Sequence, residues 1–171
     1  MPETNPFDPQ DMHAAIEALG ANLTSGWQLG LQLVIPEVGP LQRIVICGMG
    51  GSAIGGDFTA AYLLDQLPIP AVAHRNYGLP GWARGPETLV VCSSHSGNTE
   101  ETLSSFNEAH QRGCSLMSIC TGGKLAELSK EAGKTCWKFD HVGQPRTAIG
   151  WTVGLLLALF FRLGLIDDQS L

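Results

Sequence analysis

Residues 92–102 read CSSHSGNTEET, directly after the apolar run 89–91 and before an amphipathic stretch. A strand is therefore expected to run into a hydroxyl-rich turn and then into a helix. Gly97 can adopt backbone dihedrals that are closed to other residues, and the unpaired N–H groups of the first helical turn point at the same place. The turn also carries the hydroxyls of Ser93, Ser94, Ser96 and Thr99. The pattern is typical of a phosphate-binding turn, because donors come from both side chains and backbone.

Helix capping is the plainer interpretation of the same residues. Asn98, followed three residues later by Glu101, fits a capping box at the start of a helix. Capping requires one hydroxyl or amide, however, whereas this turn offers four hydroxyls. We therefore expect an anion site here, with capping as the competing hypothesis.

The composition indicates one acidic globular domain. The chain has 171 residues, 44% of them hydrophobic, with a formal net charge of −6 and a pI near 5.2. This charge disfavours nucleic acid as a partner, and any phosphate must be held by local geometry. The five cysteines are odd in number and lack metal-ligand spacing, so we expect buried thiols in a reducing cytoplasm and no metal site. They are Cys47, Cys92, Cys114, Cys120 and Cys136.

Neither end of the chain carries a recognisable targeting or membrane signal. The N-terminal sequence MPETNPFDPQ has no basic region followed by an apolar core. The longest uncharged stretch, Thr147 to Phe161, is shorter than the ~20 residues that a membrane-spanning helix needs. We expect this stretch to form a buried or interface helix, and we expect no membrane partner.

Residues 1–40 are expected to form a helical N-terminal arm. Asp8 followed by Pro9 predicts the start of a short helix that Gly20 ends, and a second helix is expected over 24–35. After Pro36 and Pro40 strands and helices alternate. The expected strands are 43–47, 69–74, 88–92, 115–120 and 135–139, and the expected helices are 52–64, 98–112 and 124–132.

The five expected strands have continuous apolar runs, so helices should cover both faces of the sheet. The sequence therefore predicts an α/β three-layer sandwich with a five-stranded parallel sheet over residues 41–171. In such sheets ligands bind at the carboxyl ends of the strands, and both glycine- or serine-rich turns lie at those ends.

The earlier turn, GMGGSAIGGD at residues 48–57, matches the relaxed dinucleotide pattern G-x-G-x-x-A. That pattern also requires an acidic residue ~20 positions further on, where this chain has Ala73, His74 and Arg75. Arg75 would suit a 2′-phosphate, so an NAD(P)-dependent oxidoreductase stays open as an alternative. A hydrolase elbow fails at Ile54, and no P-loop motif occurs.

These two turns, together with QPRTAIGW at 144–151, carry a resemblance to a known family. Over residues 43–161 the chain resembles the N-terminal sugar isomerase (SIS) domain of the bifunctional phosphoglucose/phosphomannose isomerases. The resemblance implies aldose-ketose isomerisation of glucose 6-phosphate or mannose 6-phosphate to fructose 6-phosphate, without a cofactor. It places the sugar phosphate on Gly51, Ser52, Ser94, Ser96 and Thr99. It also assigns to Arg146 the stabilisation of an enediolate, although a solvated helix end is the plainer role for such an arginine.

The chain departs from the family in ways that affect catalysis. His95 stands where the family has an aromatic residue, and it is interpreted as pocket wall. The family's general base, a glutamate, and its ring-opening histidine lie in a second SIS half beyond Leu171. Glu100 and Glu101 are poor substitutes for the base, because they serve the positive end of a helix. The chain is thus expected to be incomplete for catalysis, and a non-enzymatic sugar-phosphate sensor remains the alternative.

Two histidines and one apolar segment are further candidates for a role in binding or assembly. His74 and His141 follow apolar runs and are candidates for facing the site. The segment Trp151 to Phe161 is expected to expose an apolar patch that a second SIS half would cover. A homodimer, or a partner that carries the second half, is therefore predicted.

Overall fold

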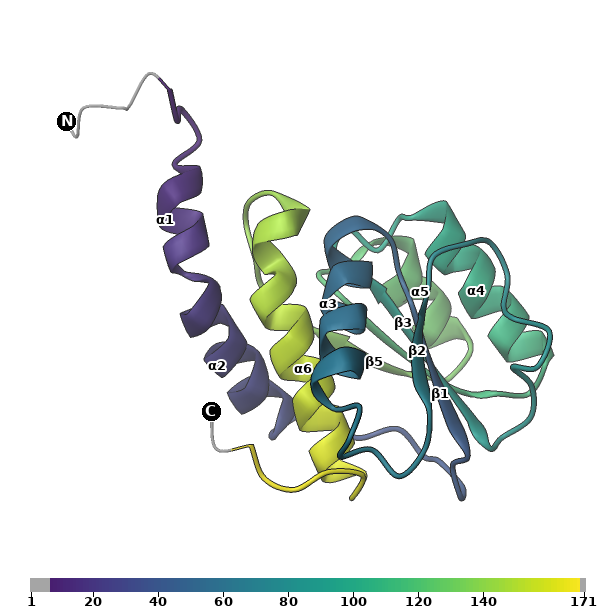
Figure 1. Ribbon diagram of the computed structural model, residues 1–171. Helices are drawn as coiled ribbons and strands as arrows, with labels where there is room; N and C mark the ends of the chain where they lie inside the picture. The colour runs from purple at the N-terminus through teal and green to yellow at the C-terminus, as the bar shows by residue number, and fades with distance from the viewer. Residues whose placement is uncertain (1–6, 170–171) are drawn as a thin grey trace.

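A five-stranded parallel sheet forms the centre of the molecule in the computed structural model, which describes residues 7–169. The spatial order of the strands is β2-β1-β3-β4-β5, and every neighbouring pair is parallel. The predicted α/β architecture is confirmed (Figure 1). The strands are β1 (Arg43–Cys47), β2 (Ala71–His74), β3 (Thr88–Ser94), β4 (Ser115–Cys120) and β5 (Thr135–Lys138).

Helices cover both faces of this sheet. The helices are α1 (Met12–Glu17), α2 (Leu19–Gly30), α3 (Gly50–Tyr62), α4 (Glu100–Gln111), α5 (Gly123–Glu131) and α6 (Ile149–Arg162), with a 3₁₀ turn η1 (Pro145–Ala148) before α6. Helices α4 and α5 cover one face, whereas α3 and α6 cover the other (Figure 1). Helix α2 lies against the outer side of α6.

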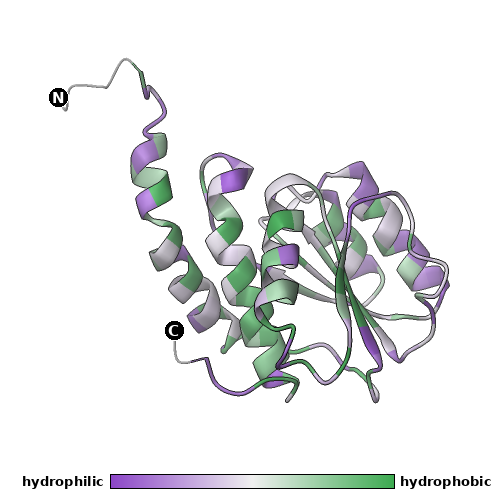
Figure 2. Cartoon of the chain, in the orientation of Figure 1, coloured by the Kyte–Doolittle hydropathy of each residue, from purple (hydrophilic) through white to green (hydrophobic). Residues whose placement is uncertain are grey.

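Alternating residues of the strands supply two separate apolar cores. Ile44 and Ile46 of β1 pack toward α6, whereas Val45 and Cys47 pack toward α4 and α5. This double burial explains why the strands are apolar without alternation (Figure 2). All five cysteines are free thiols; four of them are buried, and Cys136 is half-buried.

The N-terminal helices differ from the expectation. The Asp8 carboxylate accepts hydrogen bonds from the N–H groups of Met12 and His13, at 2.7 and 2.9 Å, but α1 begins only at Met12. Gly20 lies inside α2 and does not end a helix, and α2 stops at Gly30. Packing against α6 stabilises α2 more than the local glycine signal opposes it. Residues 1–6 of the predicted arm lie outside the described residues.

Glycines allow α2 and α6 to pack with their backbones in close approach. A Cβ atom on Gly154 would lie 2.1 Å from the carbonyl oxygen of Leu23, and one on Gly150 would lie 2.3 Å from that of Leu19. A Cβ on Gly26 would in turn lie 2.8 Å from the carbonyl oxygen of Trp151. The contact between α2 and α6 therefore depends on the absence of side chains at these positions.

The expected apolar patch on segment 151–161 is wrong. Residues 152–160 of α6 are all buried, because α2 covers one side of the helix and the sheet covers the other. The predicted homodimer thus loses its physical reason, although assembly itself stays a prediction. Within residues 7–169, no helix combines the length and apolar character needed to cross a bilayer.

We predict that Gly154→Ala lowers the free energy of unfolding by about 1–3 kcal/mol, because the new methyl group meets backbone that cannot move away locally. Gly20→Ala is the matched control: it lies in α2 with nothing within 4 Å of the new atom. This control should leave stability unchanged or raise it by up to about 1 kcal/mol. Urea denaturation measures both; equal effects of the two variants would contradict the packing account.

Candidate functional site

The turns that follow β1 and β3 lie side by side at the carboxyl edge of the sheet. The chain leaves β1 toward β2 and returns to β3 on the other side of β1, so α3 and α4 leave neighbouring strands toward opposite faces. Such a switch point opens a crevice in which ligands of parallel sheets bind. Gly48 makes the contact possible, because a Cβ there would lie 2.8 Å from the carbonyl oxygen of Ser93.

The hydroxyl-rich turn is shaped by its own side chains. The hydroxyl oxygens of Ser94 and Thr99 are 2.9 Å apart and hydrogen-bonded. The Ser94 hydroxyl also accepts the Gly97 N–H at 3.1 Å, and the Ser96 hydroxyl accepts the Asn98 N–H at 3.2 Å. Gly97 has φ 69°, in the left-handed region that favours glycine. Ser94 is buried, whereas Ser96 is exposed.

The capping interpretation of this turn is wrong within the described chain. Asn98 does not cap α4; its side-chain oxygen accepts the N–H of Lys124, at the start of α5, at 3.0 Å. The N-cap residue of α4 is Thr99, and its side chain makes no capping hydrogen bond. The first turn of α4 therefore keeps the N–H groups that can bind an anion.

The turn after β4 holds the hydroxyl-rich turn in place. The backbone N–H and the hydroxyl of Thr121 both donate to the carbonyl oxygen of His95, at 3.1 and 2.7 Å. The N–H of Leu125 donates to the carbonyl oxygen of Gly97 at 2.8 Å. A Cβ on Gly97 would lie 1.8 Å from the carbonyl oxygen of Gly122, so no larger residue fits.

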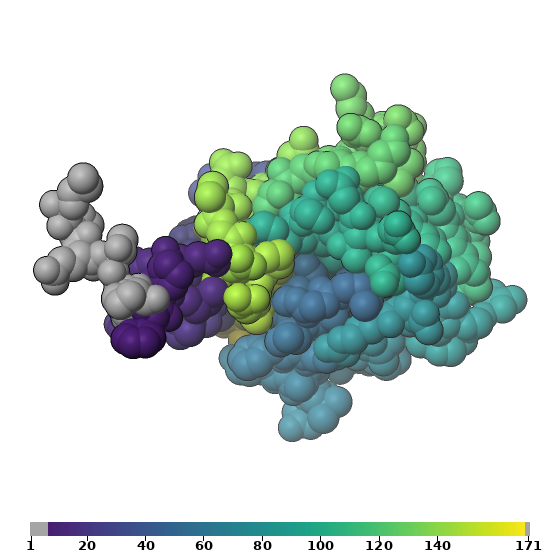
Figure 3. All heavy atoms as spheres, turned by 90° about the horizontal axis from the view of Figure 1, so that it is seen from above, coloured from purple at the N-terminus to yellow at the C-terminus, as the bar shows by residue number. Residues whose placement is uncertain are grey.

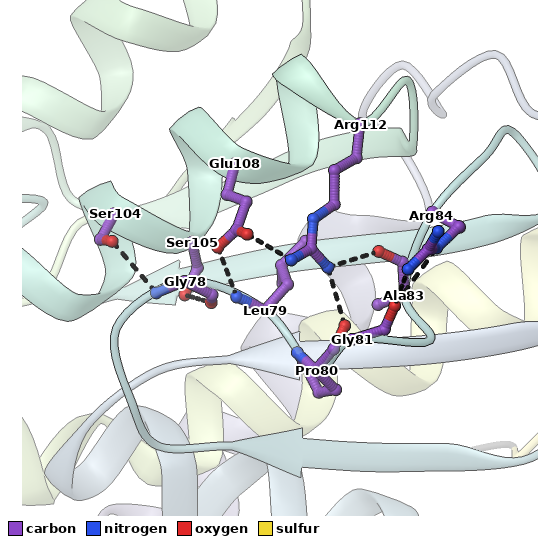
Figure 4. A network of polar contacts seen from close by, with 10 residues as sticks. All are labelled: Gly78, Leu79, Pro80, Gly81, Ala83, Arg84, Ser104, Ser105, Glu108 and Arg112. Atoms are coloured by element: carbon purple, nitrogen blue, oxygen red, sulfur yellow. Dashed lines mark hydrogen bonds and ion pairs between the residues drawn. The ribbon is translucent and has the colours of Figure 1, made fainter.

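Segment 78–84 fixes the outer face of α4 (Figure 4). The Glu108 carboxylate accepts the N–H of Leu79 at 2.8 Å and pairs with Arg112. Arg112 in turn donates to the carbonyl oxygens of Pro80 and Ala83, at 2.8 and 2.9 Å. This network sets the position of the helix whose N-terminus faces the crevice.

The first turn of α3 brings η1 into the site. A Cβ on Gly51 would lie 2.7 Å from the carbonyl oxygen of Pro145 and 3.2 Å from the Cα of Arg146. Gly51 and Ser52 are buried, whereas Arg146 is exposed. Within residues 7–169 no carboxylate forms an ion pair with Arg146. Its exposed guanidinium is therefore available for an anionic ligand.

Two histidines from distant parts of the chain meet at the same edge. Nε2 of His95 lies 3.0 Å from Nδ1 of His141, and Nε2 of His141 lies 3.3 Å from the Thr147 hydroxyl. Burial lowers the pKa of both imidazoles below the ordinary value of 6.5, and for His95 the neighbouring His141 lowers the pKa further. A backbone hydrogen bond with His141 opposes this shift of the His95 pKa. Both groups are therefore mainly neutral at pH 7.

Figure 3 looks onto this edge from above Figure 1. The start of α3 in blue, the 94–99 turn in teal and the 141–147 segment in yellow-green lie together there. A cavity of about 550 Å³ adjoins this region, between the 141–147 segment and the N-terminal helices. Its lining includes Gln10, Met12, Asn22, His141, Gln144 and Thr147, but none of the hydroxyls of the 94–99 turn.

Glu100 and His74, the other candidates for an acid or base at this edge, are less well placed for proton transfer to a ligand. Glu100 accepts a hydrogen bond from the Tyr77 hydroxyl at 3.1 Å, which raises the pKa of Tyr77. His74 ends β2, and its Nε2 is buried without a hydrogen-bond partner.

Among the described residues, no group of three or more His, Cys, Asp or Glu side chains is arranged to hold a metal ion. The pairing of His95 with His141 was missed, because no local pattern links residues 46 apart.

Sequence comparison finds similarity chiefly to bifunctional phosphoglucose/phosphomannose isomerases. The chain is 38% identical over 162 residues to the bifunctional phosphoglucose/phosphomannose isomerase of Caldicellulosiruptor bescii, covering 92% of this chain and 48% of that protein. It is also 38% identical over 137 residues to the enzyme of the same name from Aquifex aeolicus, covering 80% and 42%. The chain is a relative of the bifunctional phosphoglucose/phosphomannose isomerases. No family model matches it.

The fold agrees with this relationship. Tagatose-6-phosphate ketose/aldose isomerase from Escherichia coli superposes with a TM-score of 0.58 at 19% identity, covering 91% of this chain and 44% of that one. At this level of identity the superposition supports the fold alone, which is that of the SIS phosphosugar isomerases. The chain spans about half the length of the phosphoglucose/phosphomannose isomerases that it matches.

We predict that stability falls as the pH is lowered below 6.5, because the pKa of His95 and of His141 is lowered in the folded state. The unfolded chain then binds protons that the folded chain does not, so the stabilisation is complete above pH 6.5 and is lost as the pH approaches the folded-state pKa. Thermal unfolding between pH 5 and 8 tests this. The double variant His95→Asn/His141→Asn should show a flatter pH dependence, whereas the exposed control His110→Asn should retain the wild-type curve. A double variant as pH-dependent as the wild type would refute the assignment.

Proposed function

We propose that this chain binds a phosphorylated hexose as the phosphate-recognition part of an aldose-ketose isomerase. The proposed substrates are glucose 6-phosphate and mannose 6-phosphate, which are converted to fructose 6-phosphate. The uncapped N-terminus of α4, adjoining the hydroxyls of Ser94, Ser96 and Thr99, is the observation that carries this proposal. Gly51 and Ser52 at the start of α3 complete the cradle from the neighbouring strand.

Electrostatics favours a phosphate at this place. Backbone N–H groups and the positive end of the helix dipole attract an anion, and hydroxyls can donate to its oxygens. The overall charge of −6 provides no long-range attraction, so affinity must come from these short-range donors. We assign to Arg146 the stabilisation of an enediolate, because its backbone lies against Gly51 of the cradle and its exposed side chain has no ion-pair partner in the described chain.

The dinucleotide alternative has less support. Arg75, which would have to bind a 2′-phosphate, forms an ion pair with Asp57 of α3. A dinucleotide would also leave the 94–99 turn without a role. We therefore retain sugar phosphate as the ligand and propose no cofactor.

We propose that the proton transfer between C1 and C2 requires groups outside this chain. The relatives are about twice as long as the chain, and the family resemblance places the general base in the part that is not covered. A homodimer, or a partner carrying a second SIS half, would supply that part. The five free thiols support a cytoplasmic location.

The first prediction from the proposed function is that glucose 6-phosphate and fructose 6-phosphate raise the melting temperature of the chain, whereas free glucose does not. The reason is that the proposed hydrogen-bond donors bind the phosphate group. A ligand at 100 times its Kd adds about 2.7 kcal/mol to the free energy of unfolding. Differential scanning fluorimetry measures the shift. Equal shifts with glucose and glucose 6-phosphate, or a shift with NAD(P) alone, would disprove sugar-phosphate binding.

The second prediction concerns the hydroxyls. Ser96→Ala combined with Thr99→Val should weaken glucose 6-phosphate binding at least tenfold, because each hydrogen bond to a charged group contributes about 1.5–3 kcal/mol. Ser104→Ala is the matched control: its hydroxyl accepts the Gly78 N–H on the outer face of α4. The control should lose some stability but keep its affinity, as measured by isothermal titration calorimetry. Unchanged affinity in the double variant would show that these hydroxyls only shape the turn.

The third prediction is that the 171-residue chain alone shows no more than trace isomerase activity although it binds the substrate. Loss of a positioned general base costs ~10²–10⁴ in rate. A coupled assay that follows conversion of glucose 6-phosphate to fructose 6-phosphate provides the measurement. Addition of a second SIS half should restore turnover, whereas full activity of the chain by itself would overturn this part of the proposal.

A further inference from the structure

We propose that His95 transfers the proton that opens the ring of the bound sugar phosphate, and that His141 and Thr147 hold His95 in the required tautomer. The isolated chain should then interconvert the two anomers of glucose 6-phosphate even where it does not isomerise the sugar. This inference rests on the proposed binding of a sugar phosphate and adds a catalytic step to it.

A directional chain of hydrogen bonds supports the assignment. The Thr147 hydroxyl donates to the carbonyl oxygen of Gln144 at 2.8 Å, which uses its single proton. Toward His141, 3.3 Å away, the same hydroxyl can therefore only accept, so Nε2 of His141 carries a proton. In the neutral imidazole Nδ1 of His141 is then an acceptor.

The same reasoning fixes the tautomer of His95. Because Nδ1 of His141 accepts, Nε2 of His95 must donate across the 3.0 Å contact. Nδ1 of neutral His95 then keeps its lone pair, because the one ring proton is on Nε2. A base held by a second group in this manner is the arrangement by which imidazoles are oriented for proton transfer.

The position of His95 suits a sugar whose phosphate occupies the cradle. His95 stands between Ser94 and Ser96, and its side chain extends toward His141 and the segment that carries Arg146. Its ring lies edge-on to Phe139 with centroids 6.2 Å apart, and Phe139 stacks on Trp151. These aromatic contacts fix the imidazole, and its partial burial keeps it neutral at pH 7.

The proposed step conserves atoms and charge. Nδ1 of His95 accepts the proton of the anomeric O1 hydroxyl while the C1–O5 bond breaks and C1=O1 forms. The resulting imidazolium returns the same proton to O5. One imidazole can serve both oxygens, because O1 and O5 are both bonded to C1 before the ring opens. Meanwhile the Nε2–H of His95 remains hydrogen-bonded to His141, which stabilises the transient positive charge. Ring closure on the opposite face of the carbonyl gives the other anomer.

Exchange spectroscopy on glucose 6-phosphate tests the inference with the full 171-residue chain in a buffer free of phosphate. Interconversion of the two anomeric signals should be faster with the wild-type protein than in buffer. His95→Gln, which keeps a donor toward His141 but has no base, should lose about 10²-fold or more of the protein-dependent rate. His110→Gln, an exposed histidine on α4, is the matched control and should retain the wild-type rate.

Variants of His141 distinguish a positioning residue from a structural one. His141→Asn places an amide oxygen near the position of Nδ1 and should retain part of the rate. His141→Phe fills the space without an acceptor and should fall to the level of His95→Gln, with unchanged affinity for glucose 6-phosphate. Equal rates for the Asn and Phe variants would refute the role given to His141.

Binding is measured in parallel by the ligand-induced rise in melting temperature. This measurement separates the catalytic role of His95 from the proposed binding of a sugar phosphate. Binding without acceleration by the wild type, or acceleration that survives His95→Gln, would overturn the role of His95 and leave the proposed ligand intact. Absence of both binding and acceleration would overturn the proposed function itself, and with it this inference. Acceleration lost in His95→Gln with binding retained would support it.

Discussion

The close approach of the turns after β1 and β3 is the constraint on which the rest of the site depends. Because all strands are parallel, both turns lie at one edge, and the reversal of chain order between β1 and β3 sends α3 and α4 to opposite faces. The missing side chain at Gly48 lets the carbonyl oxygen of Ser93 come near, and that at Gly51 admits Pro145 and Arg146. Backbone contacts, rather than side-chain ion pairs, therefore assemble the crevice.

The roles of the hydroxyls follow from this arrangement. Ser94 and Ser96 accept backbone N–H groups within their own turn, and the turn after β4 holds the turn from outside. The N-terminal N–H groups of α4 are left without a capping side chain, which is a costly arrangement unless water or an anion satisfies them. A rigid turn of this kind loses little conformational entropy when a phosphate binds.

The sequence predicted the features that depend on local pattern and missed those that depend on tertiary contact. The strands Arg43–Cys47 and Ser115–Cys120 have the expected bounds, and the parallel sheet followed from their continuous apolar runs. Gly20 was misread as a helix end because the packing of α2 on α6 cannot be seen locally. Asn98 fitted a capping box, yet it binds Lys124, which lies 26 positions away. The pairing of His95 with His141 was missed for the same reason, because it is a tertiary contact between residues whose spacing matches no motif.

Amide chemical-shift mapping by NMR tests the central claim, that a sugar phosphate binds between the starts of α3 and α4. A titration of the ¹⁵N-labelled chain with glucose 6-phosphate should produce saturable shifts at Gly51, Ser52 and residues 94–101. Glucose at the same concentrations should leave these amides unchanged. Shifts confined to the cavity beside the N-terminal helices, or no saturable shifts at all, would contradict the account.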